Sequence, residues 1–262
     1  MLQLLVLGTH GAFRQAPGEY HTNALVMDGS STYLIDAGAT VIEALAAANV
    51  QPPAVDGVFV THVHGDHVGG IEELAFRKYY LEWQKLHVVA PDDVWEELFC
   101  YLDTTLTPFN AWDGSISHRL NDIIDISRIP LTITGRTLPF SPDMDSTMEF
   151  VGEPVVHVPG KPCCAYTVRD RSTGAGFWWS GDTVFCPDAI EAAACFVGTL
   201  FVDCHAKPAW PGTVHTHIDQ LQMLTQETQE KIRLIHYGSD VSALPFPSDV
   251  LRPAVAGELF KF

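Results

Sequence analysis

The chain has 262 residues, of which 47% are hydrophobic, so it is long enough to bury one sizeable core. Its formal net charge is −17, with 32 Asp and Glu residues against 15 Lys and Arg residues. Such a surface repels polyanions, so a large RNA or DNA is not expected as a partner. No linker or low-complexity segment divides the sequence, and we expect a single domain over residues 1–262.

The apolar start of the chain excludes two further classes. Residues 1–7 carry no basic residue and are too few for a signal sequence or a membrane span. The six cysteines match no zinc-finger spacing, and a core of this size needs no disulfides, so reduced thiols are expected. A cytoplasmic protein without a membrane partner is therefore the expectation.

Short strands and helices alternate through the first half of the sequence. Apolar and β-branched runs predict strands at residues 2–7, 24–27, 32–35, 58–60 and 86–89, and helices at 39–49, 70–85 and from Pro91 onwards. Asp28, Gly29 and Ser30 favour a hairpin turn between the second and third strands. Residues 103–120 are polar, aromatic and irregular, and we expect a loop insertion there.

The second half repeats this pattern. Strands are predicted at residues 123–133, 147–151, 155–158, 165–168, 177–180, 200–202 and 232–235, with helices at 188–194 and 218–228. Two β-rich halves, each followed by helices, predict an α/β fold in which two sheets pack face to face with helices outside. This is a four-layer αββα sandwich.

A cluster of polar side chains directly follows the predicted strand at 58–60. It contains His62, His64, Asp66 and His67. A single buried histidine is more often a hydrogen-bonded core residue than a ligand. Three imidazoles and a carboxylate in one loop, however, are costly to desolvate unless a cation compensates them. Nitrogen and oxygen donors without thiolate suit zinc, manganese or iron with an open coordination position, which is typical of a catalytic site.

This segment resembles the H-x-H-x-D-H signature of the metallo-β-lactamase superfamily. Further landmarks of that superfamily follow over nearly the whole chain, namely Asp36, His157, Asp182 and His236. The resemblance implies that His62, His64 and His157 hold one metal ion. It implies that Asp66, His67 and His236 hold a second, and that Asp182 bridges both. Asp36 is expected to orient the loop rather than to bind metal.

The resemblance implies two divalent metal ions as cofactors, zinc foremost, with manganese or iron as alternatives. For His157 and His236, each expected at the end of an apolar strand, a hydrogen-bonded core histidine is the alternative interpretation. For Asp182, in a Gly-Asp-Thr segment, the alternative is a simple strand-terminating turn.

Two segments are similar to the ribonuclease Z branch of the superfamily. Residues 8–12 resemble its G-T-G-x-A loop, with His10 in place of the second glycine. Residues 215–219 precede the helix expected at 218–228, and Thr216 with Asp219 predicts a capping box that leaves His215 outside the helix. A histidine at this place assists at the phosphoryl group in that branch. His215 is the first candidate and His217 the second, and two solvated histidines are the alternative.

Within that branch, the sequence is similar to the anti-Pycsar cyclic-nucleotide phosphodiesterases, which share a compact chain and an aromatic helix like that at Tyr79 and Tyr80. The resemblance implies a dinuclear metal-dependent hydrolase acting on a small phosphodiester such as a cyclic nucleotide. Asp66 would orient the attacking water, and His215 would donate a proton. A homodimer is implied by the resemblance alone. Processing of transfer RNA fits poorly with the acidic charge.

Three other functions remain open at this point. The same metals would also serve a hydrolase of carboxylic esters, thioesters or lactones. A di-iron oxidoreductase is a further possibility within the superfamily. From a different class, the chain could be a non-catalytic metal-binding sensor or scaffold, although ligands at every expected position favour an enzyme.

Overall fold

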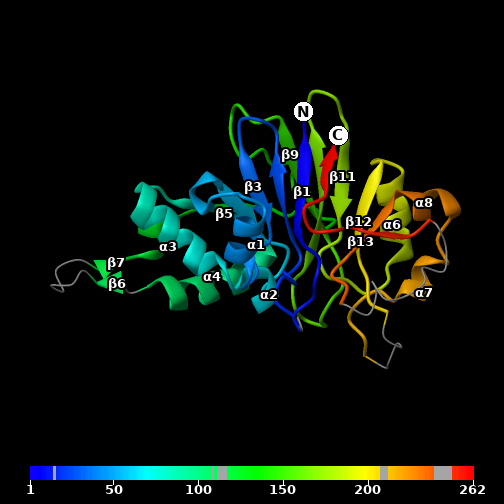
Figure 1. The fold of residues 1–262 in the computed structure, drawn as a ribbon, viewed down its shortest axis with the longest axis horizontal. Coiled ribbons are helices and arrows are strands. Elements are labelled where there is room, and N and C mark those ends of the chain that lie inside the picture. The colour runs from blue at the N-terminus through cyan, green and yellow to red at the C-terminus, as the bar shows by residue number, and fades with distance from the viewer. Residues whose placement is uncertain (14–15, 108, 111–116, 207–211, 239–249) are drawn as a thin grey trace.

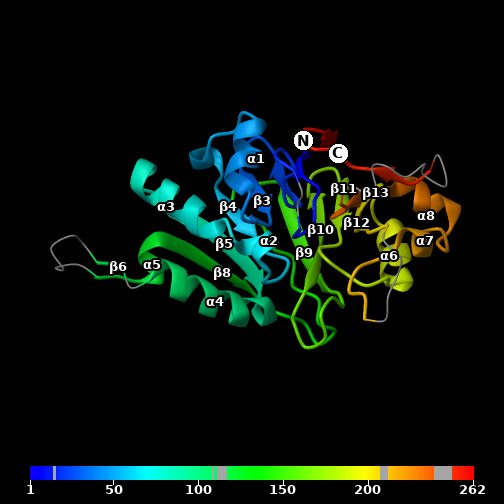
Figure 2. The same cartoon turned by 60° about the horizontal axis from the view of Figure 1, so that its bottom comes forward.

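Two β-sheets pack face to face, with helices on the outer side of each (Figures 1 and 2). The computed structural model describes residues 1–13, 16–107, 109–110, 117–206, 212–238 and 250–262. This arrangement confirms the predicted αββα sandwich. None of the helices in these described ranges is long and apolar enough to cross a membrane.

The first sheet has seven strands in the order β15-β1-β2-β3-β4-β5-β8. Their bounds are Leu259–Lys261, Gln3–Gly8, Asn23–Met27, Thr32–Ile35, Gly57–Phe59, Leu86–Pro91 and Ile124–Ile129. The strands β3, β4, β5 and β8 run parallel, so their carboxyl ends lie along one edge. The strand β8 therefore belongs to the first sheet, although the strand predicted at residues 123–133 was grouped with those of the second half of the chain.

The second sheet has six strands in the order β14-β13-β12-β11-β10-β9. Their bounds are Arg252–Pro253, Ile232–Ile235, Thr199–Asp203, Gly176–Trp179, Cys164–Asp170 and Met148–Pro154. The strands β11, β12 and β13 are parallel, and side chains of the candidate site lie at or just after their carboxyl ends. Ligand sites of parallel sheets form at such ends.

Three apolar layers hold these elements together. The helices α1 (Val41–Ala47), α3 (Ile71–Glu82) and α4 (Asp92–Leu106) pack on the outer face of the first sheet. The helices α6 (Pro187–Ala194) and α7 (Ile218–Leu221) cover the second sheet, with α8 (Gln226–Lys231) beside α6. Between the sheets, the rings of Phe59 and Phe150 stack with centroids 3.6 Å apart.

Two predicted elements differ from the structure. Residues 155–158 form no strand, because β9 ends at Pro154 and the chain turns away, so His157 lies in a loop rather than at a strand end. The helix expected at 218–228 is two short helices. Its interruption has a local cause, since the Thr225 hydroxyl accepts a hydrogen bond from the amide of Thr228 and so starts α8 anew.

The irregular segment expected at 103–120 is shorter in the structure. The helix α4 continues through Leu106, and α5 (Leu120–Ile123) begins at its other end. The strands β6 (Phe109–Asn110) and β7 (Ser117–His118) pair between them, and residues 108 and 111–116 lie outside the described part.

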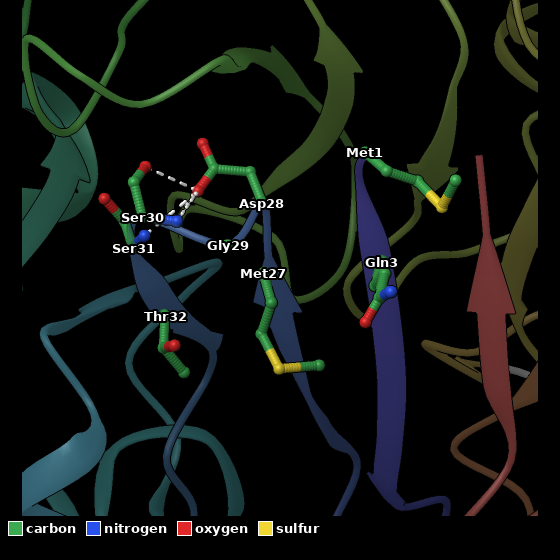
Figure 3. Close-up of a pocket in the computed structure, with 8 residues that line it drawn as sticks. All are labelled: Met1, Gln3, Met27, Asp28, Gly29, Ser30, Ser31 and Thr32. Carbon is green, nitrogen blue, oxygen red and sulfur yellow. Dashed lines mark hydrogen bonds between the residues drawn. The ribbon is translucent and has the colours of Figure 1, made fainter.

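The turn between β2 and β3 connects the two sheets at the end opposite to the carboxyl ends of the parallel strands. Figure 3 shows Asp28 turned toward Ser30 and Ser31, and these three residues line a pocket together with Met1 and Gln3. The Asp28 carboxylate accepts hydrogen bonds from both serines and from the Thr147 amide, 2.6 Å away. The last of these bonds joins the first sheet to the segment that leads into β9.

Candidate metal centre

The loop after β4 is shaped by Asp36, which directly follows β3. Its carboxylate accepts hydrogen bonds from the amide and hydroxyl of Thr61, both at 2.8 Å, and from Nδ1 of His67, also at 2.8 Å. Asp36 is fully buried and has a φ of +60°, a left-handed conformation that is uncommon outside glycine. Because Nδ1 of His67 is held, its Nε2 is the nitrogen that faces the site.

Four side chains form the first cluster. They are His62, His64, His157 and Asp182, and their ligand atoms all lie within 4.8 Å of one another. Nε2 of His157 is 3.2 Å from Nδ1 of His64, which is itself 2.9 Å from Nε2 of His62. Nδ1 of His157 donates to the carbonyl of Val214 at 2.9 Å, which leaves Nε2 as the ligand atom.

The second cluster shares Asp182 with the first. Its other members are Asp66, His67 and His236, again with all ligand atoms within 4.8 Å of one another. Asp66 and His67 lie on α2 (Gly65–Val68), and His236 follows β13. Nε2 of His236 lies 3.3 Å from a carboxylate oxygen of Asp66 and 3.3 Å from one of Asp182. All seven side chains expected to bind metal are thus brought together around Asp182.

The electrostatics of the two clusters fit cations. Burial lowers the pKa of His62 and of His157, so both imidazoles stay neutral and keep a lone pair for a metal. Burial also acts to lower the pKa of His236, but Asp182, Asp203 and Asp66 raise it to about 10. The carboxylates of the second cluster thus favour a positive charge there, which a metal cation would supply.

One contact in the second cluster also indicates a missing partner. Nε2 of His67 and Oδ1 of Asp182 are buried and lie 3.2 Å apart, yet neither makes a hydrogen bond within the described parts of the chain. Buried polar atoms are rarely left in this way. A divalent ion ligated by both resolves the mismatch, so the residues present fit a metal.

Asp203 is a site residue that the sequence analysis did not find. It ends β12, is fully buried, and accepts a hydrogen bond from Nδ1 of His215 at 2.8 Å. Its other oxygen lies 3.4 Å from Nδ1 of His236. The available signal was its position, because Asp203 ends an apolar strand of the second sheet just as Asp36 follows one of the first.

The structure separates the two histidines that precede α7. His215 joins Asp182, Asp203 and His236 in a third group of mutually close side chains. His217 belongs to none of the three groups. It caps α7 instead, with Nδ1 accepting from the amide of Asp219 at 3.1 Å.

The predicted capping box at the start of α7 is wrong in its residues. Gln220 bonds back to the amide of His217, which is the capping residue. The hydroxyl of Thr216 points the other way and donates to the carbonyl of Thr183. His215 nevertheless lies outside the helix, as expected, because the cap is displaced by only one residue.

Comparison with known proteins agrees with this geometry. The model of the family described as "Anti-Pycsar protein Apyc1" matches residues 2–247. The chain belongs to the anti-Pycsar Apyc1 family. An Apyc1 protein of Paenibacillus sp. (strain J14) is 32% identical over 242 residues, which are 92% of this chain and 91% of that protein. An Apyc1 protein of Bacillus phage 010DV004 is 27% identical and covers 99% of this chain and 98% of its own.

Solved structures share the fold of this family member at low identity. The metallo-β-lactamase-fold protein YhfI of Bacillus subtilis superposes with a TM-score of 0.73 at 18% identity, covering 99% of this chain and 98% of its own. The short form of human tRNase Z gives a TM-score of 0.71 at 15% identity over the same shares. The interpretation of the sequence as a metallo-β-lactamase-fold hydrolase of the anti-Pycsar type is thereby confirmed, and the His and Asp clusters indicate divalent-metal binding.

Proposed function

We propose that this chain hydrolyses the phosphodiester of a cyclic nucleotide at a centre of two divalent metal ions, zinc foremost. Anti-Pycsar proteins degrade cyclic nucleotides, and the chain belongs to their family. The observation that carries the proposal is the convergence of two His and Asp clusters on one shared carboxylate, Asp182. Two adjacent sites with a common ligand are typical of metal pairs that serve phosphoryl transfer.

The ligands divide by cluster. His62, His64 and His157 would hold the first ion, and Asp66, His67 and His236 the second, with Asp182 common to both. When bound, such ions lower the pKa of water and offset the charge that develops on phosphoryl oxygens. The remaining chemistry falls to the side chains around them.

Asp203 fixes the proton of His215. Because an ionised carboxylate only accepts, Nδ1 of His215 must carry the proton that it donates to Asp203 at 2.8 Å. Nε2 is then the nitrogen that can donate to the phosphoryl or leaving oxygen. His215 is also partly exposed, with a quarter of its side chain open to solvent. It therefore supports the role of general acid better than His217, whose Nδ1 is engaged in capping α7.

Asp66 has the position for orienting the attacking water. Its pKa lies well below the usual range, because the hydrogen bonds and charges of His236 and His67 outweigh the effect of burial. It is thus ionised throughout the neutral range and can accept a hydrogen bond from the attacking water. A small substrate suits the acidic chain, since a cyclic nucleotide brings one negative charge where a polynucleotide brings many.

Three variants test the assignment. His64→Ala and Asp182→Ala should lose bound metal and all turnover of 3′,5′-cyclic nucleotides. His215→Ala should keep its metal and lose roughly 10²–10⁴-fold in kcat, the contribution of a positioned acid. His217→Ala serves as the matched control and should lose far less. Metal loss in His215→Ala equal to that in the ligand variants would remove His215 from catalysis.

A substrate panel separates the rival activities. It includes a cyclic nucleotide, bis-p-nitrophenyl phosphate, a homoserine lactone and a thioester, all with metal-loaded protein. Faster turnover of the lactone or thioester than of either phosphodiester would overturn the proposal. The absence of any turnover by metal-loaded protein would favour a sensor or scaffold. A cytoplasmic location and a homodimer are further parts of the proposal, which fractionation and light scattering address.

A further inference from the structure

The loop formed by residues 8–22, here called the N-terminal loop, is anchored at its base beside the metal centre. The amide of His10 donates to the carbonyl of Tyr20 at 3.0 Å, and the amide of Thr22 donates to the carbonyl of His10 at 2.9 Å. Nε2 of His10 lies 3.5 Å from a carboxylate oxygen of Glu19. Through these contacts His10, which replaces a glycine of the G-T-G-x-A pattern, holds the two ends of the loop together.

The N-terminal loop touches a proposed metal ligand. A Cβ atom built on Gly11 would lie 2.9 Å from Cε1 of His236, closer than real side-chain carbons approach. Any larger residue at position 11 would therefore have to displace the His236 ring. The ring of His10 also lies against the next residue after His236, with 6.1 Å between its centroid and that of Tyr237.

Phe13 follows two residues after this contact and is 95% exposed. Two residues of extended chain span at most ~7 Å, so its Cα lies within that distance of Gly11. Its ring therefore buries almost no surface against the described parts of the chain and is open to a ligand. Because Gly11 contacts the His236 ring, this exposed surface belongs to the loop that borders the metal centre.

We propose that Phe13 is a specificity residue that stacks on the base of a nucleotide bound at the metal centre. The inference rests on the proposed function. Every nucleobase offers a flat π-face to an aromatic ring, whichever polar groups it carries. Such stacking contributes to affinity in proteins that bind single-stranded nucleic acids. An acidic chain gains from this mode, because it adds affinity for the nucleoside without needing a cation.

Matched variants of exposed phenylalanines test the inference. Phe13→Ala should raise KM for a 3′,5′-cyclic nucleotide about tenfold, which corresponds to ~1.4 kcal/mol, with kcat changing little. Phe13→Tyr should restore the wild-type KM, since it keeps the ring, and Phe13→Leu should not. Phe196→Ala is the control, because Phe196 is 66% exposed and packs over the guanidinium of Arg169, which pairs with Gly176 at the end of β11 away from Asp182.

The deciding readout is the preference for a nucleotide over a base-free analogue. Wild type, Phe13→Ala and Phe196→Ala are each assayed with the cyclic nucleotide and with ribose 3′,5′-cyclic phosphate, which has no base. The ratio of the two kcat/KM values should fall about tenfold in Phe13→Ala and stay unchanged in Phe196→Ala. An unchanged ratio in Phe13→Ala, or full retention of it in Phe13→Leu, would overturn the inference alone. Failure of the wild type to turn over the cyclic nucleotide would instead overturn the proposed function, and this inference with it.

Discussion

Replacing Asp36 by asparagine should weaken metal binding without touching a metal ligand. In the structure one oxygen of Asp36 accepts from the Thr61 amide, and the other accepts from the Thr61 hydroxyl and from Nδ1 of His67. Asparagine keeps an acceptor for the amide but presents an NH₂ group to the other two partners. His67 then faces a donor with its own N–H, so its ring either shifts or moves the proton to Nε2.

Both responses act on the second cluster. A proton on Nε2 of His67 occupies the lone pair that would bind metal, 3.2 Å from Asp182. Loss of an orienting carboxylate behind a histidine ligand typically reduces metal affinity 10- to 100-fold, which is ~1.4–2.8 kcal/mol. The hydrogen bonds lost to Asp36 predict a comparable fall in the stability of the metal-free protein, roughly 2–3 kcal/mol.

The assay is a competition titration of zinc against a chromophoric chelator, with urea unfolding of the metal-free protein alongside. Asp56→Asn is the matched control, because the Asp56 carboxylate accepts a hydrogen bond from the amide of Thr32 at the opposite end of β3 and β4. It should keep its zinc affinity and most of its stability, because asparagine still offers an acceptor to the Thr32 amide. Wild-type zinc affinity in Asp36→Asn would refute the assignment of Asp36 as the residue that orients His67.

Three further predictions follow from the structure. Chelation should abolish turnover, and added zinc or manganese should restore it. The far-ultraviolet circular dichroism should stay unchanged on chelation, because apolar layers hold the sheets together, and unfolding would contradict this. The pKa of His236 is raised to about 10 from an ordinary 6.5, so its protonation stabilises the metal-free protein fully below pH 6.5 and this contribution is lost as the pH rises toward 10. Urea unfolding of the metal-free protein at pH 6.5 and 9.5 measures the loss, and equal stability at both pH values would count against it. Asp28→Ala removes five accepted hydrogen bonds in a partly exposed turn and should destabilise the fold by roughly 2–3 kcal/mol in urea, with turnover per folded molecule retained; a fall in kcat would show coupling across the sheets.

Much of the fold was readable from local pattern. The β-branched and apolar runs of β3, β4, β12 and β13 place strands where the structure has them, because side chains buried between two layers must be apolar along the whole strand. The turn at Asp28 and the start of α4 after Pro91 were also predicted, since both depend on residues adjacent in sequence.

Other elements depended on distant partners. Residues 155–158 are as apolar as a strand, yet the Val156 carbonyl accepts from the Val184 amide in a loop, and Nδ1 of His157 donates to Val214. For His215 and His217, the local capping pattern favoured His215 but could not show its partner. That partner is Asp203, which is distant in sequence and accepts a hydrogen bond from His215.

The sequence by itself indicated the chemistry of this protein, because the three histidines and the one carboxylate of residues 62–67 already form a set of metal-binding donors. Only the tertiary structure decided which other side chains complete that set and which hold it in place. Asp36 and Asp203 are ordinary residues in their own neighbourhoods. Strand order and loop path bring Asp36 next to His67 and Asp203 next to His215. Short-range sequence patterns do not indicate such contacts.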